Sequence, residues 1–334
     1  MALRTLSHRE RLEACLAGEE PDRTPIALWR HFPVDDQTPE GLAVATAAFQ
    51  RSYDFDLIKV TPPSSFCLKD WGSDDQWTGS VEGTREYQRF VIQRPEDWPR
   101  LPILNPQQGK LGAQLNCLRI LITEFSPQIP VVQTVFSPLA QAKNLVGGDE
   151  LLIHLRQNPE ELHAGLEKIT RSTILFLEEL RKSGVDGIFY AIQHAQYGLL
   201  SETEFQKFAR AYDLKVLEAA RSMWLNIGHI HGENIMFDQV IDYPVAVLNW
   251  HDQHTSPSLS EAAQKFKGVL CGGLRRWETM VLGTPIQVQT EARVAIQATQ
   301  GKRFILGTGC VMPIITPHGN ILAARESVTQ EGIL

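Results

Sequence analysis

The chain has 334 residues, of which 43% are hydrophobic and 21% are charged, and its formal net charge is -7. This composition is typical of a globular protein with a large core, and the acidic balance argues against nucleic acid as a partner. No run of about 18 apolar residues is present, so no membrane-spanning helix is predicted. The polar N-terminus lacks the apolar core of a signal peptide, and we therefore expect a cytoplasmic protein.

Short β-rich runs alternate with amphipathic stretches of helical period along the chain. A first helix is predicted after Ser7, because Ser7 and Glu10 have the spacing of a capping box. Strands are predicted at residues 25–29, 56–60, 131–136, 187–190, 224–230, 245–250, 268–272 and 304–306. Helices are predicted between most of them, among others at residues 159–183, 202–222, 259–267 and 285–299. Thr284 is a good N-cap for the last of these, and Pro285 suits its first position.

About eight strands that alternate with helices are typical of a (β/α)8 barrel. We therefore predict an α/β protein in which residues 1–334 form a single TIM barrel domain. The longer stretch 67–130 is predicted to be an insertion between the second and third strands. An open, doubly wound sheet is the alternative, but no glycine-rich dinucleotide fingerprint follows the first strand.

The barrel hypothesis places the active site at the carboxyl ends of the strands. Polar side chains of the kinds that bind metals and substrates do follow the predicted strands. These are Arg30, Lys59, Gln193, His194, His229, His231, His251, Asp252, Thr308 and Cys310. The amino ends of the strands show no comparable concentration of histidine and cysteine.

His229 and His231 are the most informative pair. They are two residues apart in one predicted strand, so both imidazoles leave the same face. Cys310 follows the last strand, which faces the histidine strand across a barrel mouth. Catalytic zinc takes about three protein ligands, and a thiolate with imidazoles favours zinc over magnesium. The sequence thus predicts a zinc site, with burial of His229 and Cys310 in the core as the alternative. Glu233, His251 and Asp252 are the candidates for a fourth ligand or for a residue that orients the ligands.

Two further groups are candidates for chemistry at the barrel mouth. Arg30 directly follows the first strand and would clamp a carboxylate or phosphate of an anionic substrate. The alternative is an exposed arginine paired with Asp35 or Asp36. Asp252 would orient His251 as a general acid or base. The alternative is that both residues belong to a polar loop without a catalytic role.

Several stretches of the chain resemble the uroporphyrinogen decarboxylase superfamily. They are Ser7-His-Arg-Glu-Arg-Leu12, Pro21-Asp-Arg-Thr-Pro25, Asp54-Phe-Asp-Leu-Ile-Lys-Val-Thr-Pro62, Gly184-Val-Asp-Gly-Ile-Phe189 and Phe304-Ile-Leu-Gly-Thr-Gly-Cys310. The resemblance covers most of the chain and implies a (β/α)8 barrel. The superfamily contains true uroporphyrinogen decarboxylases and methyltransferases that are linked to corrinoids and coenzyme M.

The departures from the family pattern favour the methyltransferase branch. True decarboxylases carry Arg-Gln-Ala-Gly-Arg after the first strand, whereas this chain reads Arg30-His-Phe-Pro-Val34. The family's substrate-binding aspartate falls near Pro62, its tyrosine near Asn144, and its serine at Gln193, with His194 retained. Most of the apparatus that would bind a substrate with many carboxylates is therefore missing.

This chain also resembles the methyltransferase branch at the metal motif of that branch, which is His-x-Cys followed far downstream by Cys. Here His229, His231 and Cys310 stand in the corresponding places, with histidine as the middle ligand. The resemblance implies a zinc ion that lowers the pKa of an acceptor thiol and presents the thiolate to a methyl donor. Nothing in the chain resembles a corrinoid-binding domain, so a corrinoid would come from a separate partner protein.

The leading hypothesis is zinc-dependent methyl transfer involving a thiol or a corrinoid. Its residues are His229, His231 and Cys310 for the metal, His194, His251 and Asp252 for catalysis, and Arg30, Lys59, Gln193 and Thr308 for an anionic substrate. One alternative is a metal-free decarboxylase acting on a tetrapyrrole or a smaller carboxylate. Another is a non-catalytic barrel that binds a small ligand or a corrinoid protein. The resemblance to decarboxylases also implies a homodimer, although no interface signal is found in the sequence.

Overall fold

The fold is built on one parallel sheet whose strands follow one another in chain order. The computed structural model describes residues 5–329. The sheet order is β1-β4-β5-β6-β7-β8-β9. These strands are β1 (Ile58–Val60), β4 (Val131–Phe136), β5 (Gly187–Ile192), β6 (Ile227–Ile230), β7 (Val247–Trp250), β8 (Val269–Leu274) and β9 (Phe304–Thr308). Neighbouring parallel strands need crossover connections, which helices supply here.

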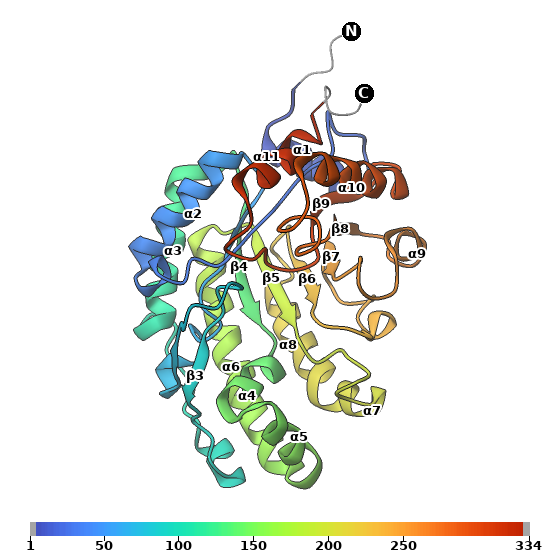
Figure 1. Ribbon diagram of the computed structural model, residues 1–334. Helices are drawn as coiled ribbons and strands as arrows, with labels where there is room; N and C mark the ends of the chain where they lie inside the picture. Colours follow the sequence, from blue (N-terminus) through green and yellow to red (C-terminus); the bar gives the residue numbers. More distant parts are fainter. Residues whose placement is uncertain (1–4, 330–334) are drawn as a thin grey trace.

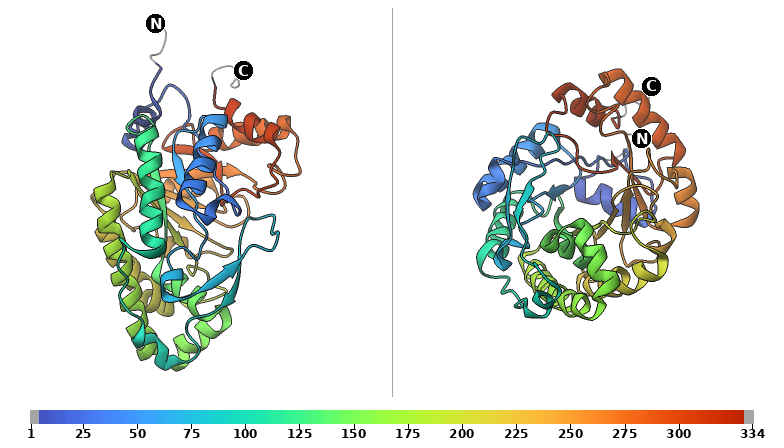
Figure 2. Two further views of the ribbon diagram at one scale, coloured as in Figure 1. Left: turned by 90° about the vertical axis from the view of Figure 1, so that its left-hand side faces the viewer. Right: turned by 60° about the horizontal axis from the view of Figure 1, so that its bottom comes forward.

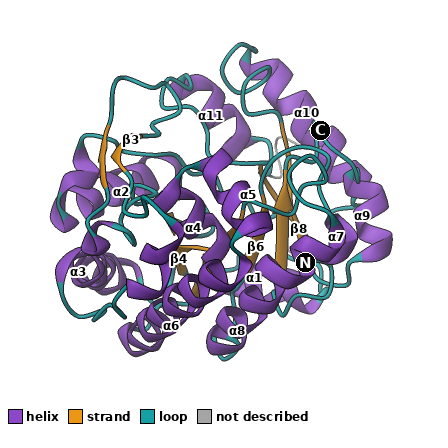
Figure 3. Cartoon of the chain, turned by 90° about the horizontal axis from the view of Figure 1, so that it is seen from below, coloured by secondary structure: helices purple, strands orange, loops and turns teal. Residues whose placement is uncertain are grey.

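Helices surround this sheet on its outside and cover its two ends. They are α1 (His8–Ala17), α2 (Pro39–Tyr53), α3 (Gly109–Phe125), α4 (Pro138–Val146), α5 (Gly148–Gln157), α6 (Pro159–Ser183), α7 (Glu202–Phe205), α8 (Ala211–Ala220), α9 (Leu259–Lys265), α10 (Pro285–Ala298) and α11 (His318–Glu326). Figure 1 shows the strands at the centre, and the right-hand view of Figure 2 shows the helices as a ring around them. In the view from below, α4 and α5 lie across the end of this ring (Figure 3). None of the described helices combines the length and the hydropathy needed to cross a membrane.

Residues 25–30 lie between the two edges of the curled sheet. On one side the backbone N–H of Ala27 donates to the carbonyl of Leu306 in β9, at 2.9 Å. On the other side the carbonyl of Ile26 accepts from the backbone N–H of Asp56, also at 2.9 Å. The predicted first strand is therefore present as isolated bridges and not as a regular strand. The predicted α/β class is confirmed as a curled parallel sheet surrounded by helices.

A separate apolar cluster fills the space that the strands enclose, near the end where they begin. Leu12 and Cys15 of α1 belong to this cluster, together with inward-facing strand residues such as Leu57, Val132 and Ile227. Helix α1 therefore plugs the amino end of the interior. The inward-facing positions beyond this cluster, at the carboxyl ends of the strands, are left for polar side chains.

The helix starts follow the predicted capping signals. Ser7 and Glu10 form the expected capping box of α1, and Thr284 caps α10 with Pro285 in its first turn. Helix α6 has the predicted bounds. The predicted helix at 202–222 is interrupted by a wider turn at Gln206–Arg210, between α7 and α8.

The segment between β1 and β4 carries a hairpin of β2 (Asp74–Gln76) and β3 (Glu86–Arg89), besides helix α3. Loops at the edge of the sheet hold the hairpin on both sides. Arg85 forms an ion pair with Asp36, and Trp277 Nε1 donates to Glu82 at 2.7 Å. Arg276 also pairs with Glu82. The hairpin is thus fastened to the loops after residues 25–30 and after β8.

The N-terminal stretches that resemble the family meet in one buried charge network. The carboxylate of Asp56 is fully buried and accepts from His8 Nδ1 at 2.9 Å and from Arg11 and Arg23 at 2.7 Å. It also accepts from the backbone N–H of Ile26 at 2.8 Å. The network therefore ties α1 to the first sheet segment and to the residues before β1.

We expect the stability of the fold to fall as the pH rises through the pKa of His8. Burial lowers the pKa of His8, but Asp54 and Asp56 raise it, and the result is about 9 against an ordinary 6.5. A raised pKa of this kind stabilises the folded state fully below the unfolded value, and the contribution is lost above the folded value. Denaturant unfolding of wild type and His8→Gln measures this. The difference in unfolding free energy should be largest near pH 6 and should shrink toward about pH 10. An unchanging difference would mean that His8 is neutral in the fold.

Candidate metal centre and active site

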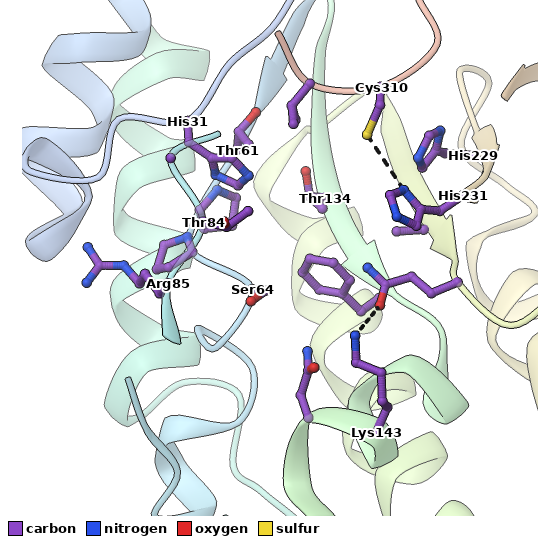
Figure 4. A pocket seen from close by; sticks show the side chains of 18 of the residues that line it. His31, Thr61, Ser64, Thr84, Arg85, Thr134, Lys143, His229, His231 and Cys310 are labelled. Carbon is purple, nitrogen blue, oxygen red and sulfur yellow. Dashed lines mark hydrogen bonds between the residues drawn. The ribbon is translucent and has the colours of Figure 1, made fainter. Parts of the chain in front are cut away.

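A cavity of about 440 Å³ opens at the carboxyl ends of the strands. Its lining comes from the strands of the parallel sheet, from α4 and from the hairpin. Polar side chains in the lining include His31, Lys59, Thr61, Ser64, Thr84, Arg85, Tyr87, Thr134, Lys143, Asn144, Gln193, His229, His231 and Cys310. Figure 4 shows Lys143 at one end of this cavity and Cys310 with the two histidines at the other.

Four side chains converge at the Cys310 end of the cavity. One ligand atom each from His229, His231, His251 and Cys310 lies within 4.8 Å of the others. Zinc bonds of about 2.3 Å to sulfur and 2.0 Å to nitrogen, at a tetrahedral angle, place the two atoms about 3.5 Å apart. Cys310 Sγ lies 3.7 Å from His231 Nδ1. The spacing and the donor set of three imidazoles with one thiol therefore fit a zinc ion.

The ring of His229 is held in the tautomer that a metal ligand needs. Asn249, its register neighbour in β7, is fully buried and donates through Nδ2 to the carbonyls of Cys271 and Thr308, at 2.8 and 3.1 Å. The amide oxygen of Asn249 must then accept, and it lies 2.7 Å from His229 Nδ1. His229 Nδ1 is therefore protonated, which leaves the lone pair of Nε2 for a metal.

His251 and Cys310 carry the other signs of a metal-binding site. His251 Nε2 is buried and has no hydrogen-bond partner in the described part of the chain. Burial alone would raise the pKa of Cys310, but His229, His231 and His251 lower it, and the net pKa lies well below the ordinary thiol value. A thiolate is the form of cysteine that binds metals. The structure thus adds His251 to the three residues that the sequence predicted to converge.

The predicted acid–base pair of Asp252 with His251 is wrong. The Asp252 carboxylate accepts from the backbone N–H of Gly273, at 3.1 and 3.2 Å, and from Gln253 Nε2 at 2.7 Å. Burial raises the pKa of Asp252 to about 6 despite these bonds. Consecutive residues of an extended chain point to opposite sides, so a His251 that faces the metal cluster turns Asp252 toward β8. Glu233, a further candidate, is exposed and lies outside the cluster.

The predicted position of Arg30 in the barrel mouth is also wrong. Its guanidinium lies 5.3 Å from the ring centre of Phe32 and 5.5 Å from that of Phe49, and it donates to the carbonyl of Ile314 at 3.0 Å. Trp29 faces the interior, so its neighbour Arg30 faces the helices. The alternative pairing with Asp35 or Asp36 is not found among the described residues either, and Asp36 pairs with Arg85 instead.

The other predicted site residues divide into two groups. Lys59 and Gln193 line the cavity. Thr308 and His194 do not belong to its lining. The Thr308 hydroxyl donates to the carbonyl of Cys310 at 2.6 Å, which shapes the loop that carries the thiol. His194 is buried, and burial lowers its pKa to about 3, so its ring is neutral.

Sequence reasoning missed the cations that the surrounding elements bring to the cavity. Lys143 comes from α4 and lies 3.4 Å from Gln193 Oε1, while Arg85 comes from the hairpin. Neither follows a strand, so the rule that located the other residues does not reach them. Among the described residues that line the cavity there is no aspartate or glutamate. The cavity of this acidic chain is therefore locally basic.

The comparisons with known proteins agree with the fold and identify the family of the chain. The family described as uroporphyrinogen decarboxylase matches residues 7–330. A methylcobamide:CoM methyltransferase, MtbA, of Methanosarcina acetivorans is 22% identical over 94% of this chain and 95% of its own. The methylcobamide:CoM methyltransferase MtaA of Methanosarcina barkeri is also 22% identical, over 95% of this chain and 97% of its own. A uroporphyrinogen decarboxylase of Klebsiella pneumoniae is 28% identical, but over only 38% of this chain and 37% of its own.

The solved structures show the same architecture. A methyltransferase from Methanosarcina mazei superposes with a TM-score of 0.84 over 96% of this chain and 98% of its own, at 18% identity. A B12-independent methionine synthase from a Shewanella species has a TM-score of 0.60 over 92% of this chain and 93% of its own, at 13% identity. At these identities the likeness establishes the fold. Since the family match spans nearly the whole sequence, the chain belongs to the uroporphyrinogen decarboxylase family.

Proposed function

We propose that this chain is a zinc-dependent methyltransferase that moves a methyl group between a corrinoid and a thiol. The observation that carries the proposal is the convergence of His229, His231, His251 and Cys310 within 4.8 Å of one another at the cavity end. The names and the near-complete coverage of the methyltransferase relatives support it. We also propose that residues 1–334 form one (β/α)8 barrel, in which residues 25–30 take the place of the eighth strand.

In this proposal His229, His231, His251 and Cys310 hold the metal, and Asn249 orients His229. A zinc ion bound there would lower the pKa of an incoming thiol and favour its thiolate form. His251, which the sequence offers both as an acid–base catalyst and as a fourth ligand, is assigned the role of ligand. The Thr308 hydroxyl fixes the loop of Cys310 through the carbonyl bond described above. The corrinoid would be presented by a separate protein, as the resemblance to the family predicts.

The charge of the cavity supports an anionic thiol as the acceptor. Its described lining contains Lys59, Arg85 and Lys143 but no carboxylate. Arg85 is neutralised by Asp36, whereas Lys143 has only the amide of Gln193 as a hydrogen-bond partner among the described residues. A thiol bound at the metal end would place an acidic group within the basic part of the cavity near Lys143.

The Lys143→Met substitution is expected to raise the KM for an anionic thiol by about tenfold, because it removes one charge-assisted hydrogen bond to the substrate. The KM for a neutral thiol should change little. Steady-state kinetics with 2-mercaptoethanesulfonate and with 2-mercaptoethanol compare the two cases. Lys182→Met is the matched control, because Lys182 is exposed and pairs with Glu179 on α6. Equal changes in KM for both thiols would argue against Lys143 as the anchor.

The proposal is tested by metal content and by methyl transfer from methylcobalamin to 2-mercaptoethanesulfonate. We expect about one zinc per chain, and thiol-dependent demethylation of the corrinoid that a chelator abolishes. A protein that binds no metal even when zinc is offered would contradict the proposal. Consumption of uroporphyrinogen in the presence of chelator, with porphyrin products, would instead support the decarboxylase alternative.

A further inference from the structure

Lys59 is a buried lysine with an unusual environment. It lies in the middle of β1 and lines the cavity, and only 7% of its surface is exposed. Its Nζ lies 3.1 Å from Thr61 Oγ1, 4.5 Å from the ring centre of Phe189 and 5.7 Å from that of Trp29. No ion pair of Lys59 is found among the residues that the structure describes. The amine therefore meets aromatic faces and one hydroxyl, and no carboxylate.

A buried ammonium without a counter-ion is disfavoured, so such a lysine tends to lose its proton. Burial lowers the pKa of Lys59, the negative charge of the Cys310 thiolate opposes this, and the resulting pKa is about 7. The other titratable groups that face the metal end of the cavity are His31, His229, His231 and Cys310. His31 is neutral, because burial and the charge of Lys59 lower its pKa to about 4. Lys59 is thus a lining group outside the metal cluster that has a free lone pair near neutral pH and still binds a proton there, whereas the neutral His31 is too weak a base to do so.

We propose that Lys59 accepts the proton of the acceptor thiol, an inference that rests on the proposed function. The thiol S–H bond breaks, its proton forms a new N–H bond on Nζ, and the electron pair stays on sulfur. The sulfur then bonds to the methyl carbon, while the bond from that carbon to the corrinoid breaks and leaves its electron pair on the donor. The ammonium of Lys59 returns its proton to water after the methylated thioether leaves.

A different role for Lys59 would be a permanent cation that anchors the anionic group of the substrate. The two roles differ in whether an arginine can take the place of Lys59. Arginine keeps a positive charge but does not exchange its proton near neutral pH, so it can anchor an anion and cannot act as a base. Lys59→Arg should therefore lose as much turnover as Lys59→Met, about 10²- to 10⁴-fold, if the lysine is the proton acceptor. A small primary amine added to Lys59→Ala should restore part of the turnover.

The decisive measurement is the number of protons released when a thiol binds to the zinc-loaded protein. Titration calorimetry with 2-mercaptoethanesulfonate in two buffers of different ionisation enthalpy gives this number near pH 7.5, where a free thiol is mostly protonated. Wild type and the surface control Lys182→Met should release few protons to the buffer, because Lys59 takes them up. Lys59→Met and Lys59→Arg should each release about one proton per thiol.

The outcomes separate the inference from the proposed function. If wild type and both variants bind the thiol and release the same number of protons, Lys59 is not the acceptor, and the methyltransferase proposal is unaffected. If Lys59→Arg turns over like wild type, Lys59 is an anion anchor and the inference is again overturned. If the zinc-loaded wild type does not bind the thiol, the proposed function fails and the inference fails with it. Should Lys59→Met not fold, Lys59→Arg and the amine rescue of Lys59→Ala decide the question.

Discussion

Replacing His231 with alanine is expected to remove zinc from the protein and to lower methyl transfer by more than about 100-fold. Changing a residue that only supports a ligand already costs about 10- to 100-fold in metal affinity or activity, and His231 is proposed to be a ligand itself. Its Nδ1 lies 3.7 Å from Cys310 Sγ, so its loss leaves the thiol without this partner. Plasma mass spectrometry on the purified proteins measures the metal, with about one zinc per chain in wild type and far less in His231→Ala.

A neighbouring histidine provides the control for this prediction. His254 follows His251 in the same loop, with ring centres 6.4 Å apart, but its Nε2 faces Glu278 at 3.6 Å, and His254 does not belong to the cluster. His254→Ala should therefore keep the zinc content and the activity of wild type. If His231→Ala also keeps its zinc, His231 is not a ligand, and the three remaining side chains would need another explanation for their convergence.

The metal cluster could be predicted because two local rules meet in it. Alternation along a strand puts His229 and His231 on one face, and the parallel order of the strands brings the end of β9 to the same opening. The same alternation excludes Arg30 and Asp252 from the site. Trp29 faces the cavity and His251 faces the metal cluster, so the residue that follows each of them points to the opposite side.

Other features depend on contacts between distant segments and are not encoded locally. Lys143 reaches the cavity because α4 lies across the end of the sheet, and Arg85 reaches it on a hairpin that Asp36 and Glu82 fasten in place. Residues 25–30 have the composition of a strand, yet they form only isolated bridges, to Leu306 in β9 and to Met312. By contrast, the capping residues of α1 and α10 act within one turn, which explains why those helix starts were predicted correctly.

Asp56→Asn is expected to lower the free energy of unfolding by about 3–5 kcal/mol. The carboxylate of Asp56 is fully buried and pairs with Arg11 and Arg23, whose side chains are only 4% and 10% exposed. Burial raises the pKa of Asp56, but His8 and the two arginines lower it to about 2, so it is charged at neutral pH. An asparagine offers one acceptor oxygen and adds two donors, which leaves buried guanidinium groups without a counter-charge. Urea denaturation near neutral pH measures the loss.

The control is Asp238→Asn, since Asp238 pairs with Lys265 at the surface, where the two side chains are 65% and 46% exposed. That substitution should change the free energy of unfolding by less than about 1 kcal/mol. A similarly small loss in Asp56→Asn would mean that the network is not a main support of the fold. Because Asp56 lies at the amino end of the strands and the histidine cluster at the carboxyl end, Asp56→Asn should still bind zinc while it is folded. Loss of zinc from the folded variant would show instead that the network also determines the geometry of the metal site.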